Sequence, residues 1–114
     1  MADQSPAELT PDQVVQSMPE YFLPEKAGNT RATIQFDLTG EHAGKWFVTI
    51  ADGKVTTGQG EAESPNLTLI ADSTDYVKIF TGQLDPTAAF MSGKLKLKGD
   101  MGLAIRMQSM FRRP

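Results

Sequence analysis

The chain has 114 residues, of which 39% are hydrophobic and 22% are charged, values that are ordinary for one globular domain. Its net charge of −3 argues against a nucleic-acid partner, because nucleic-acid binders neutralise phosphates with clustered lysine and arginine. It has no cysteine and one histidine, which excludes disulfides and any metal site built on cysteine or on a pair of histidines. We therefore predict no metal and no cofactor.

The ends of the chain carry no recognisable targeting signal. The polar start predicts a flexible tail over residues 1–9, followed by one domain over residues 10–114. The N-terminus lacks the basic region and apolar run of a secretory signal, and Phe111-Arg-Arg-Pro114 is not a peroxisomal tripeptide. These features predict a cytoplasmic protein that has at most transient contact with membranes.

The first predicted element is a helix that begins after Thr10. Thr10 suits the N-cap, Pro11 suits the first helical position, and Gln13 completes a capping box. Pro19 is expected to end the helix, because proline lacks a backbone N–H and clashes with the preceding turn. Residues 25–30 are expected to form a loop.

Four strands are predicted next. Apolar and polar residues alternate over 33–38 and again over 46–50, which is typical of strands with one buried face. Asp52-Gly53 predicts a tight hairpin, because the favoured two-residue turn needs positive φ angles. Residues 54–60 are then the return strand, and residues 66–70 form the fourth strand.

Helices dominate the second half of the sequence. Helical spacing of apolar residues predicts a helix between a capped start at Asp72–Asp75 and Gly82, and Asp85-Pro86 begins a short helix that runs to Met91. A fifth strand is expected around Leu95 and Leu97, before a last helix over residues 101–111. This order predicts an α+β fold with a five-stranded, mostly antiparallel sheet and helices on one face.

The last predicted helix is too apolar for a surface element. At about 100° per residue, its apolar side chains cover an arc of roughly 220°, about twice the width that packing on a sheet requires. They are Met101, Leu103, Ala104, Ile105, Met107, Met110 and Phe111. The extra width can be covered by an apolar ligand, another part of the core or a second copy of the chain.

Polar residues near this helix are the remaining site candidates. Gln108 falls inside the apolar arc, where a buried amide would contact either a ligand headgroup or nearby backbone. Lys94, Lys96 and Lys98 share one strand face, which could attract phosphates but is more often a solvated face that discourages edge pairing.

The second half of the sequence resembles the sterol carrier protein type 2 family. The matching residues occur in order and at the family's spacing: Thr81-Gly82, Leu84-Asp85-Pro86, Ala89-Phe90, Ser92-Gly-Lys-Leu-Lys96, Gly99-Asp-Met-Gly-Leu-Ala104 and Gln108, with a weaker match over 46–54. The resemblance implies a non-enzymatic domain that binds and transfers lipids in an apolar tunnel enclosed by the sheet and helices. It also implies that Leu103, Met107, Gln108 and Phe111 approach the ligand. The full predicted lipid site adds Phe36, Trp46, Tyr76, Phe90 and Met101.

A fatty acid or fatty acyl-CoA is the expected ligand, ahead of a sterol. The chain is acidic, lacks a peroxisomal address and carries an extra residue at Asp72-Ser-Thr-Asp75 relative to the family. The alternative function is an accessory module that presents acyl substrates to a partner enzyme, and a homodimer also remains open. A small isomerase would need a buried carboxylate or tyrosine in the tunnel, for which only Asp75 and Tyr76 are candidates.

Overall fold

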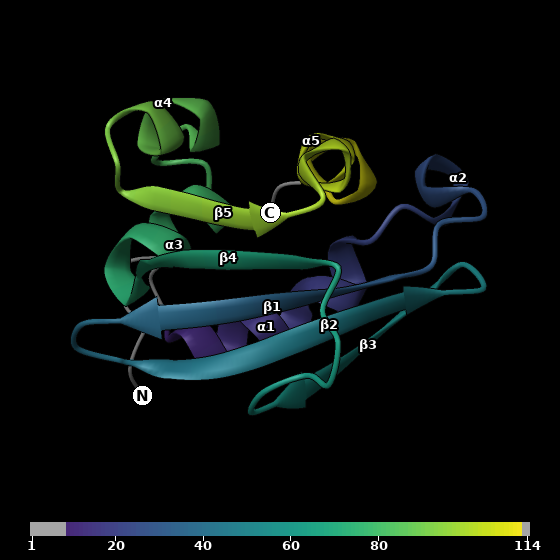
Figure 1. Ribbon diagram of the computed structural model, residues 1–114, viewed down its shortest axis with the longest axis horizontal. Coiled ribbons are helices and arrows are strands. Elements are labelled where there is room, and N and C mark those ends of the chain that lie inside the picture. The colour runs from purple at the N-terminus through teal and green to yellow at the C-terminus, as the bar shows by residue number, and fades with distance from the viewer. Residues whose placement is uncertain (1–8, 113–114) are drawn as a thin grey trace, which may run out of the picture.

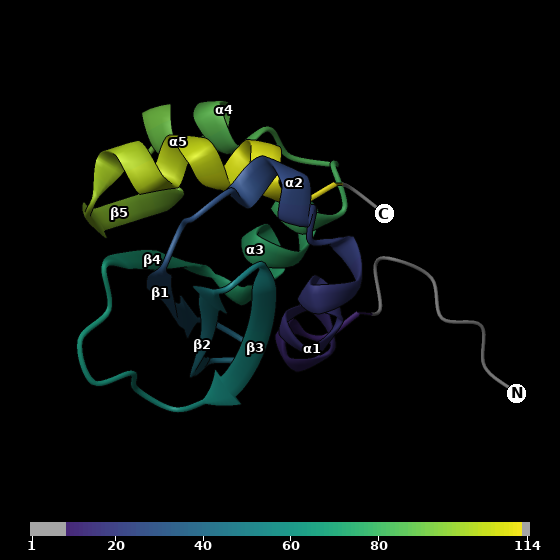
Figure 2. The ribbon, with the colours of Figure 1, turned by 90° about the vertical axis from the view of Figure 1, so that its right-hand side faces the viewer.

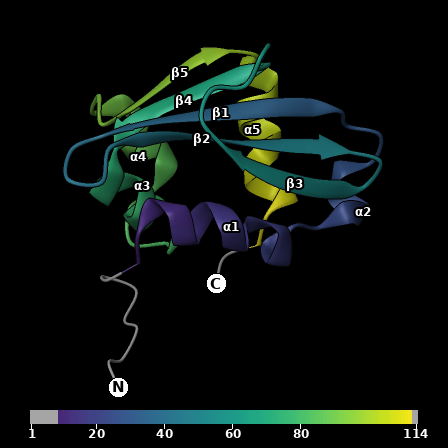
Figure 3. The same ribbon diagram turned by 90° about the horizontal axis from the view of Figure 1, so that it is seen from below.

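The computed structural model describes residues 9–112, which form a curved five-stranded sheet with helices on one face (Figures 1 and 3). Residues 1–8 of the predicted tail, and Arg113 and Pro114, lie outside the described residues, whereas Leu9 packs against the core. The strands lie in the order β3-β2-β1-β4-β5, and only the β1–β4 pair is parallel. Their bounds are Ala32–Thr39 (β1), Gly44–Ala51 (β2), Lys54–Gln59 (β3), Leu67–Asp72 (β4) and Leu95–Gly99 (β5). The predicted α+β fold is confirmed.

Two connections fix the strand order. Asp52 and Gly53 have φ angles of 54° and 73°, as the tight turn between β2 and β3 requires. The segment from β3 to β4 then crosses the face of the sheet that carries no helix, where the buried side chain of Gln35 holds it. The Gln35 amide nitrogen donates to the Gly60 carbonyl (3.1 Å), and its oxygen accepts from the Ala62 N–H (2.7 Å). This crossing places β4 beside β1.

Helix α1 (Pro11–Tyr21) covers β2 and β3. Its capping box forms as predicted, because the Gln13 N–H donates to the Thr10 hydroxyl oxygen (3.2 Å) while the Gln13 side chain accepts from the Thr10 N–H (2.9 Å). The prediction that Pro19 ends the helix is wrong, since the helix continues through two more residues. Proline removes one backbone hydrogen bond near the end of the helix, and the burial of Met18 against the core maintains the last turn.

The connector after α1 contains a one-turn helix, α2 (Pro24–Ala27), where a loop was expected. This segment also holds the end of the chain. The Leu23 N–H donates to the Met110 carbonyl (2.7 Å), the Arg112 N–H donates to the Tyr21 carbonyl (2.8 Å), and Phe22 pairs with Phe111. We call these contacts the α1–α5 bridge.

Three helices cover the other end of the sheet: α3 (Ser73–Phe80), α4 (Pro86–Met91) and α5 (Met101–Met110). Asp85 and Asp100 cap α4 and α5 by accepting from the N–H groups of Ala88 (2.9 Å) and Leu103 (3.0 Å). Asp72 precedes α3, but its side chain makes no capping hydrogen bond, which corrects the predicted capped start.

Gly99 makes the turn from β5 into α5. Its φ angle is +110°, and a Cβ atom at this position would overlap the Asn66 carbonyl oxygen. The next residue is held in place because the Asp100 N–H donates to the same oxygen (2.9 Å). Glycine therefore lets α5 start directly against the edge of the sheet, beside β4 and β5.

Candidate functional site

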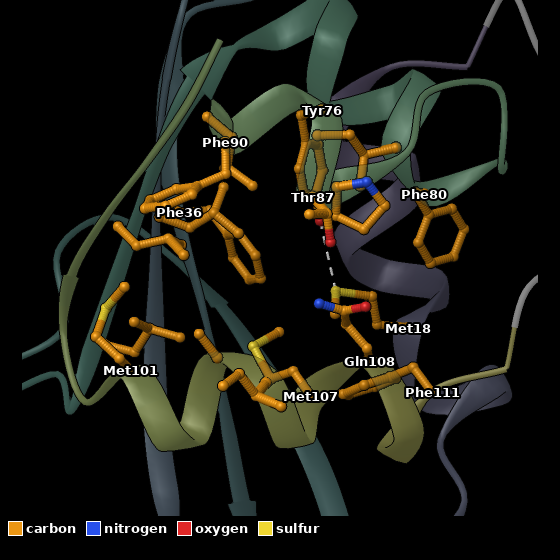
Figure 4. Close-up of a pocket in the computed structure, with 18 of the residues that line it drawn as sticks. Met18, Phe36, Tyr76, Phe80, Thr87, Phe90, Met101, Met107, Gln108 and Phe111 are labelled. Carbon is orange, nitrogen blue, oxygen red and sulfur yellow. Dashed lines mark hydrogen bonds between the residues drawn. The ribbon is translucent and has the colours of Figure 1, made fainter. Parts of the chain in front are cut away.

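A cavity of about 350 Å³ lies between the β4–β5 end of the sheet and helices α3, α4 and α5 (Figure 4). Most of its lining is apolar: Met18, Phe36, Leu67, Leu69, Tyr76, Ile79, Phe80, Pro86, Phe90, Leu95, Leu97, Met101, Ala104, Ile105, Met107 and Phe111. The remaining lining residues are Thr87, Gln108 and Arg112. This size and composition are typical of pockets that bury an apolar ligand and orient it with a few polar groups.

The cavity opens to solvent between α4 and α5. Three of the apolar residues that line it are exposed, namely Phe90, Met101 and Ile105, and Ile105 exposes 71% of its surface. Within residues 9–112 the predicted tunnel is therefore an open pocket. Side chains that line a pocket and also face water gain the most from an apolar occupant, because its binding removes their surface from water.

The strand side of the cavity comes from alternating residues of β4 and β5. Leu67, Leu69, Leu95 and Leu97 face the helices, whereas Lys96 and Lys98 lie on the opposite face of β5 and are exposed. The alternation predicted for the fifth strand is therefore confirmed, and the lysines do not point into the pocket.

Tyr76 closes the deep side of the cavity. Its ring packs on Phe36, with ring centroids 5.2 Å apart, and its hydroxyl donates to the sulfur of Met18 (3.5 Å), a contact drawn as the dashed line in Figure 4. Burial raises the pKa of Tyr76 well above its usual value, so the phenol is neutral at physiological pH. Asp75 does not line the cavity, so the Asp75–Tyr76 pair considered for an isomerase is not assembled there.

The polar residues gather where α5 ends. The Gln108 side chain, expected to be buried, is exposed and makes no hydrogen bond within residues 9–112. The guanidinium carbon of Arg112 lies 4.8 Å from the centroid of the Tyr21 ring, and one guanidinium nitrogen lies 3.5 Å from the Glu20 carbonyl oxygen. This end of the cavity thus offers an unpaired amide and a cation to a ligand headgroup.

Seven of the nine predicted site residues line the cavity: Phe36, Tyr76, Phe90, Met101, Met107, Gln108 and Phe111. Trp46 and Leu103 lie outside it. Leu103 is fully buried on the sheet side of α5, and Trp46 lies under α1, where its indole N–H donates to Asp12 (3.0 Å). A smaller hollow of about 250 Å³ adjoins Trp46, between α1 and β3.

Several lining residues were not singled out from the sequence. Ile79 and Phe80 belong to the apolar stripe of α3, and Leu69 and Leu97 belong to the alternation of their strands. Their periodicity marked them as inward-facing, but it could not distinguish a packed core from a cavity wall.

Two kinds of feature are absent from residues 9–112. None of their helices is both long and apolar enough to cross a membrane. Among residues 9–112 there is also no group of three histidine, cysteine or acidic side chains that could hold a metal ion.

Comparison with known proteins identifies the family of this chain. The sequence matches the SCP-2 sterol transfer family over residues 14–112. It is also similar to hydroxysteroid dehydrogenase-like protein 2 of Xenopus tropicalis, with 46% identity over 85 residues that cover 74% of this chain and 20% of that protein. The chain therefore spans about a fifth of the length of the curated relatives it matches.

Solved structures show the same fold. The sec-alkylsulfatase Pisa1 from Pseudomonas sp. contains a matching region with a TM-score of 0.81 and 19% identity, over 94% of this chain and 17% of that chain. Palmitated SCP2L2 from Aedes aegypti matches with a TM-score of 0.71 and 20% identity, over 92% of this chain and 97% of that chain. The fold, the cavity and the family match agree: the chain belongs to the SCP-2 sterol transfer family, whose domains bind and transfer lipids.

Proposed function

We propose that residues 10–114 form a non-enzymatic domain that binds a lipid with one acyl chain in the α3–α5 cavity and transfers it between membranes. The observation that carries the proposal is the cavity itself, about 350 Å³ of mostly apolar lining with polar groups at one end. An acyl chain matches the apolar walls, while a carboxylate or thioester matches the polar end at Gln108 and Arg112.

The energetics of acyl burial support binding in the range of tens of micromolar without a strong headgroup contact. Burying a 16-carbon chain at about 0.8 kcal/mol per methylene contributes on the order of 10 kcal/mol before costs. Association and chain ordering cost at least about 4 kcal/mol, which leaves about 6 kcal/mol from the chain, a dissociation constant of tens of micromolar that headgroup contacts would tighten. The proposed ligand class is fatty acid or fatty acyl-CoA, ahead of a sterol. The palmitated form of the structural neighbour SCP2L2 supports this order of preference.

The first test is analysis of what the purified protein carries. Native mass spectrometry and organic extraction should recover a fatty acid or acyl-CoA in near-stoichiometric amount. Delipidated protein should then bind palmitate at concentrations of tens of micromolar or below. Protein that purifies empty and does not bind added palmitate or acyl-CoA would contradict the proposal.

A matched pair of variants tests whether the lipid occupies this cavity. Ala104 lines the cavity on α5, so Ala104→Phe fills space that the acyl chain would use. Ser109 lies on the same helix, is exposed and does not line the cavity, so Ser109→Phe is the control. Palmitate affinity should fall at least about tenfold in Ala104→Phe and stay unchanged in Ser109→Phe. Equal affinity in both variants would place the lipid elsewhere.

A second candidate function is an accessory module that presents acyl substrates to an enzyme. This candidate is favoured by the small share of each relative that the chain matches. It matches only a fifth of hydroxysteroid dehydrogenase-like protein 2 and 17% of the Pisa1 chain. A lipid-exchange assay between two vesicle populations separates the candidates. The isolated chain should accelerate exchange if it is a transfer protein, whereas an accessory module would bind palmitate without accelerating exchange.

A further inference from the structure

The charged residues of this acidic protein are segregated along the chain. Residues 86–112, which form α4, β5 and α5, contain five basic side chains and one acidic one, Asp100. Residues 9–85 contain five basic and eleven acidic side chains. The net charge of −3 therefore conceals a basic end, which forms the upper part of the molecule in both Figure 1 and Figure 2.

Exposed apolar side chains gather at the same end. Four large apolar residues of the described chain are exposed, and all lie on α4 or α5: Phe90, Met91, Met101 and Ile105. Met91 exposes 80% of its surface and does not line the cavity, whereas the other three surround its opening. We call these four residues the apolar rim.

The basic residues near the rim have few internal partners. Within residues 9–112, salt bridges are found for Arg31 and Lys45, and none for Lys94, Lys96, Lys98 or Arg106. Lys94 lies in the turn that follows Met91, and the other two lysines lie along β5. Their long side chains can reach past the sheet edge toward a surface that the rim contacts. An anionic surface is therefore the complementary partner.

We propose that the apolar rim and its flanking basic residues dock the protein on an anionic lipid bilayer, with the cavity opening against the membrane. Apolar side chains flanked by lysine and arginine are the combination that binds bilayer interfaces. Docking in this orientation lets an acyl chain pass from bilayer to cavity without crossing water. A symmetric homodimer through this end is disfavoured, because it would bring two basic surfaces together. The proposal extends the proposed lipid transfer, but the docking step can be measured without it.

The experiment is vesicle cosedimentation of the full chain, using phosphatidylcholine vesicles with and without phosphatidylglycerol, at low and high salt. Binding should require phosphatidylglycerol and weaken at high salt. Lys94→Gln/Lys98→Gln should weaken binding roughly 20- to 30-fold, since each lysine near an anionic surface contributes about fivefold. Lys45→Gln/Lys54→Gln removes the same charge from β2 and β3, at the other edge of the sheet, and should change binding little.

The apolar contribution is tested separately with Met91→Glu. It should reduce vesicle binding at least about tenfold, because a charge replaces a side chain that enters the interface. Gln59→Glu introduces the same charge on exposed β3 and is the control. All these variants should keep the circular dichroism spectrum and palmitate affinity of the wild type, since none of the substituted residues lines the cavity.

Three outcomes would overturn the docking proposal. They are failure of the wild type to bind anionic vesicles at low salt, equal loss in the two lysine pairs, and full binding by Met91→Glu. The first of these would leave an acidic protein surface as the partner. Vesicle binding by a protein that does not bind palmitate would instead refute the proposed function and leave the docking surface standing.

Discussion

Helices α1 and α5 lie on the same face of the same sheet and cover it in different ways. Val14, Val15 and Met18 of α1 are at most 4% exposed and pack over strands in which Val48 and Ile50 are fully buried. Of the ten residues of α5, only Leu103 and Met110 are buried, and the rest of its apolar arc borders the cavity or faces water.

The apolar side chains of the two halves therefore differ in what they can contribute, which is stability in the α1 half and ligand contacts in the α5 half. Closely packed apolar groups contribute the burial and dispersion energy that holds the fold, which is the role of the α1 half. Apolar groups that remain partly hydrated in the free protein are available to a ligand, which is the role that we propose for the α5 half. An apolar helix sequence alone does not say which of these roles it has.

The largest expected effect comes from truncating an isoleucine in each half. Ile50→Ala should lower the free energy of unfolding by about 2–5 kcal/mol, because Ile50 of β2 is fully buried in the core. Ile105→Ala should change it by less than about 0.5 kcal/mol, because Ile105 is mostly exposed. Urea unfolding measures both, and equal losses would mean that the two halves do not differ as described.

A ligand should make the α5 half contribute to stability as well. Palmitate at about 100 times its dissociation constant should raise the free energy of unfolding by about 2.7 kcal/mol, or roughly 10 °C in melting temperature. The same shift should appear in Ile50→Ala, whose cavity is intact, and should disappear in Ala104→Phe. Differential scanning calorimetry measures it, and an unchanged melting temperature in the wild type would count against lipid binding.

The capping box of α1 should have a smaller effect. Thr10→Ala removes the hydroxyl that accepts from the Gln13 N–H and should destabilise the protein by about 1 kcal/mol. The matched change on α5, Ser109→Ala, removes only a hydrogen bond to the carbonyl within its own helix and should be nearly neutral. Thermal unfolding of the two variants compares them directly. A neutral Thr10→Ala would mean that α1 is held by packing alone.

The smallest effect concerns pH. The hydrogen bond and positive charge of Lys45 hold the pKa of Glu61 below its ordinary value of 4.5. A lowered carboxylate pKa stabilises the fold above pH 4.5, and this contribution is lost as pH falls through the lowered pKa. Wild type should therefore unfold at slightly higher urea than Glu61→Gln at pH 7 and at equal urea near pH 3. A difference that persists at the lower pH would have a cause other than ionisation.

Much of the fold could be predicted because its signals are local. The hairpin at Asp52-Gly53 and the caps at Thr10 and Asp85 depend on a few neighbouring residues, and all formed as expected. The continuation of α1 beyond Pro19 depends instead on the burial of Met18 in the core, and the segment from α1 to α2 is joined to the distant end of α5. The α1–α5 bridge joins segments nearly 90 residues apart, which no local pattern can indicate.

The sequence predicted an apolar site at the last helix, but it did not predict the full set of residues that line the cavity. The wide apolar arc of α5 indicated more apolar surface than packing on the sheet uses, and most of the predicted residues line the cavity. Leu103 was misplaced because an arc wider than half the helix does not reveal which part faces the sheet. Trp46 was misplaced because the order of the strands, which puts β2 under α1 and β4 near α5, comes from a crossing that the sequence does not mark.

The α1–α5 bridge has a further consequence for how a lipid gets in. The start of α5 is held at the Asn66 carbonyl and its end at Tyr21 and Leu23, so the helix is a fixed wall and not a swinging flap. A lipid must then pass between side chains at the opening, such as Phe90 and Met101, while the backbone stays in place. Rotamer changes of exposed side chains take picoseconds to nanoseconds, so uptake should be limited by extraction of the lipid from the membrane on which the protein is docked.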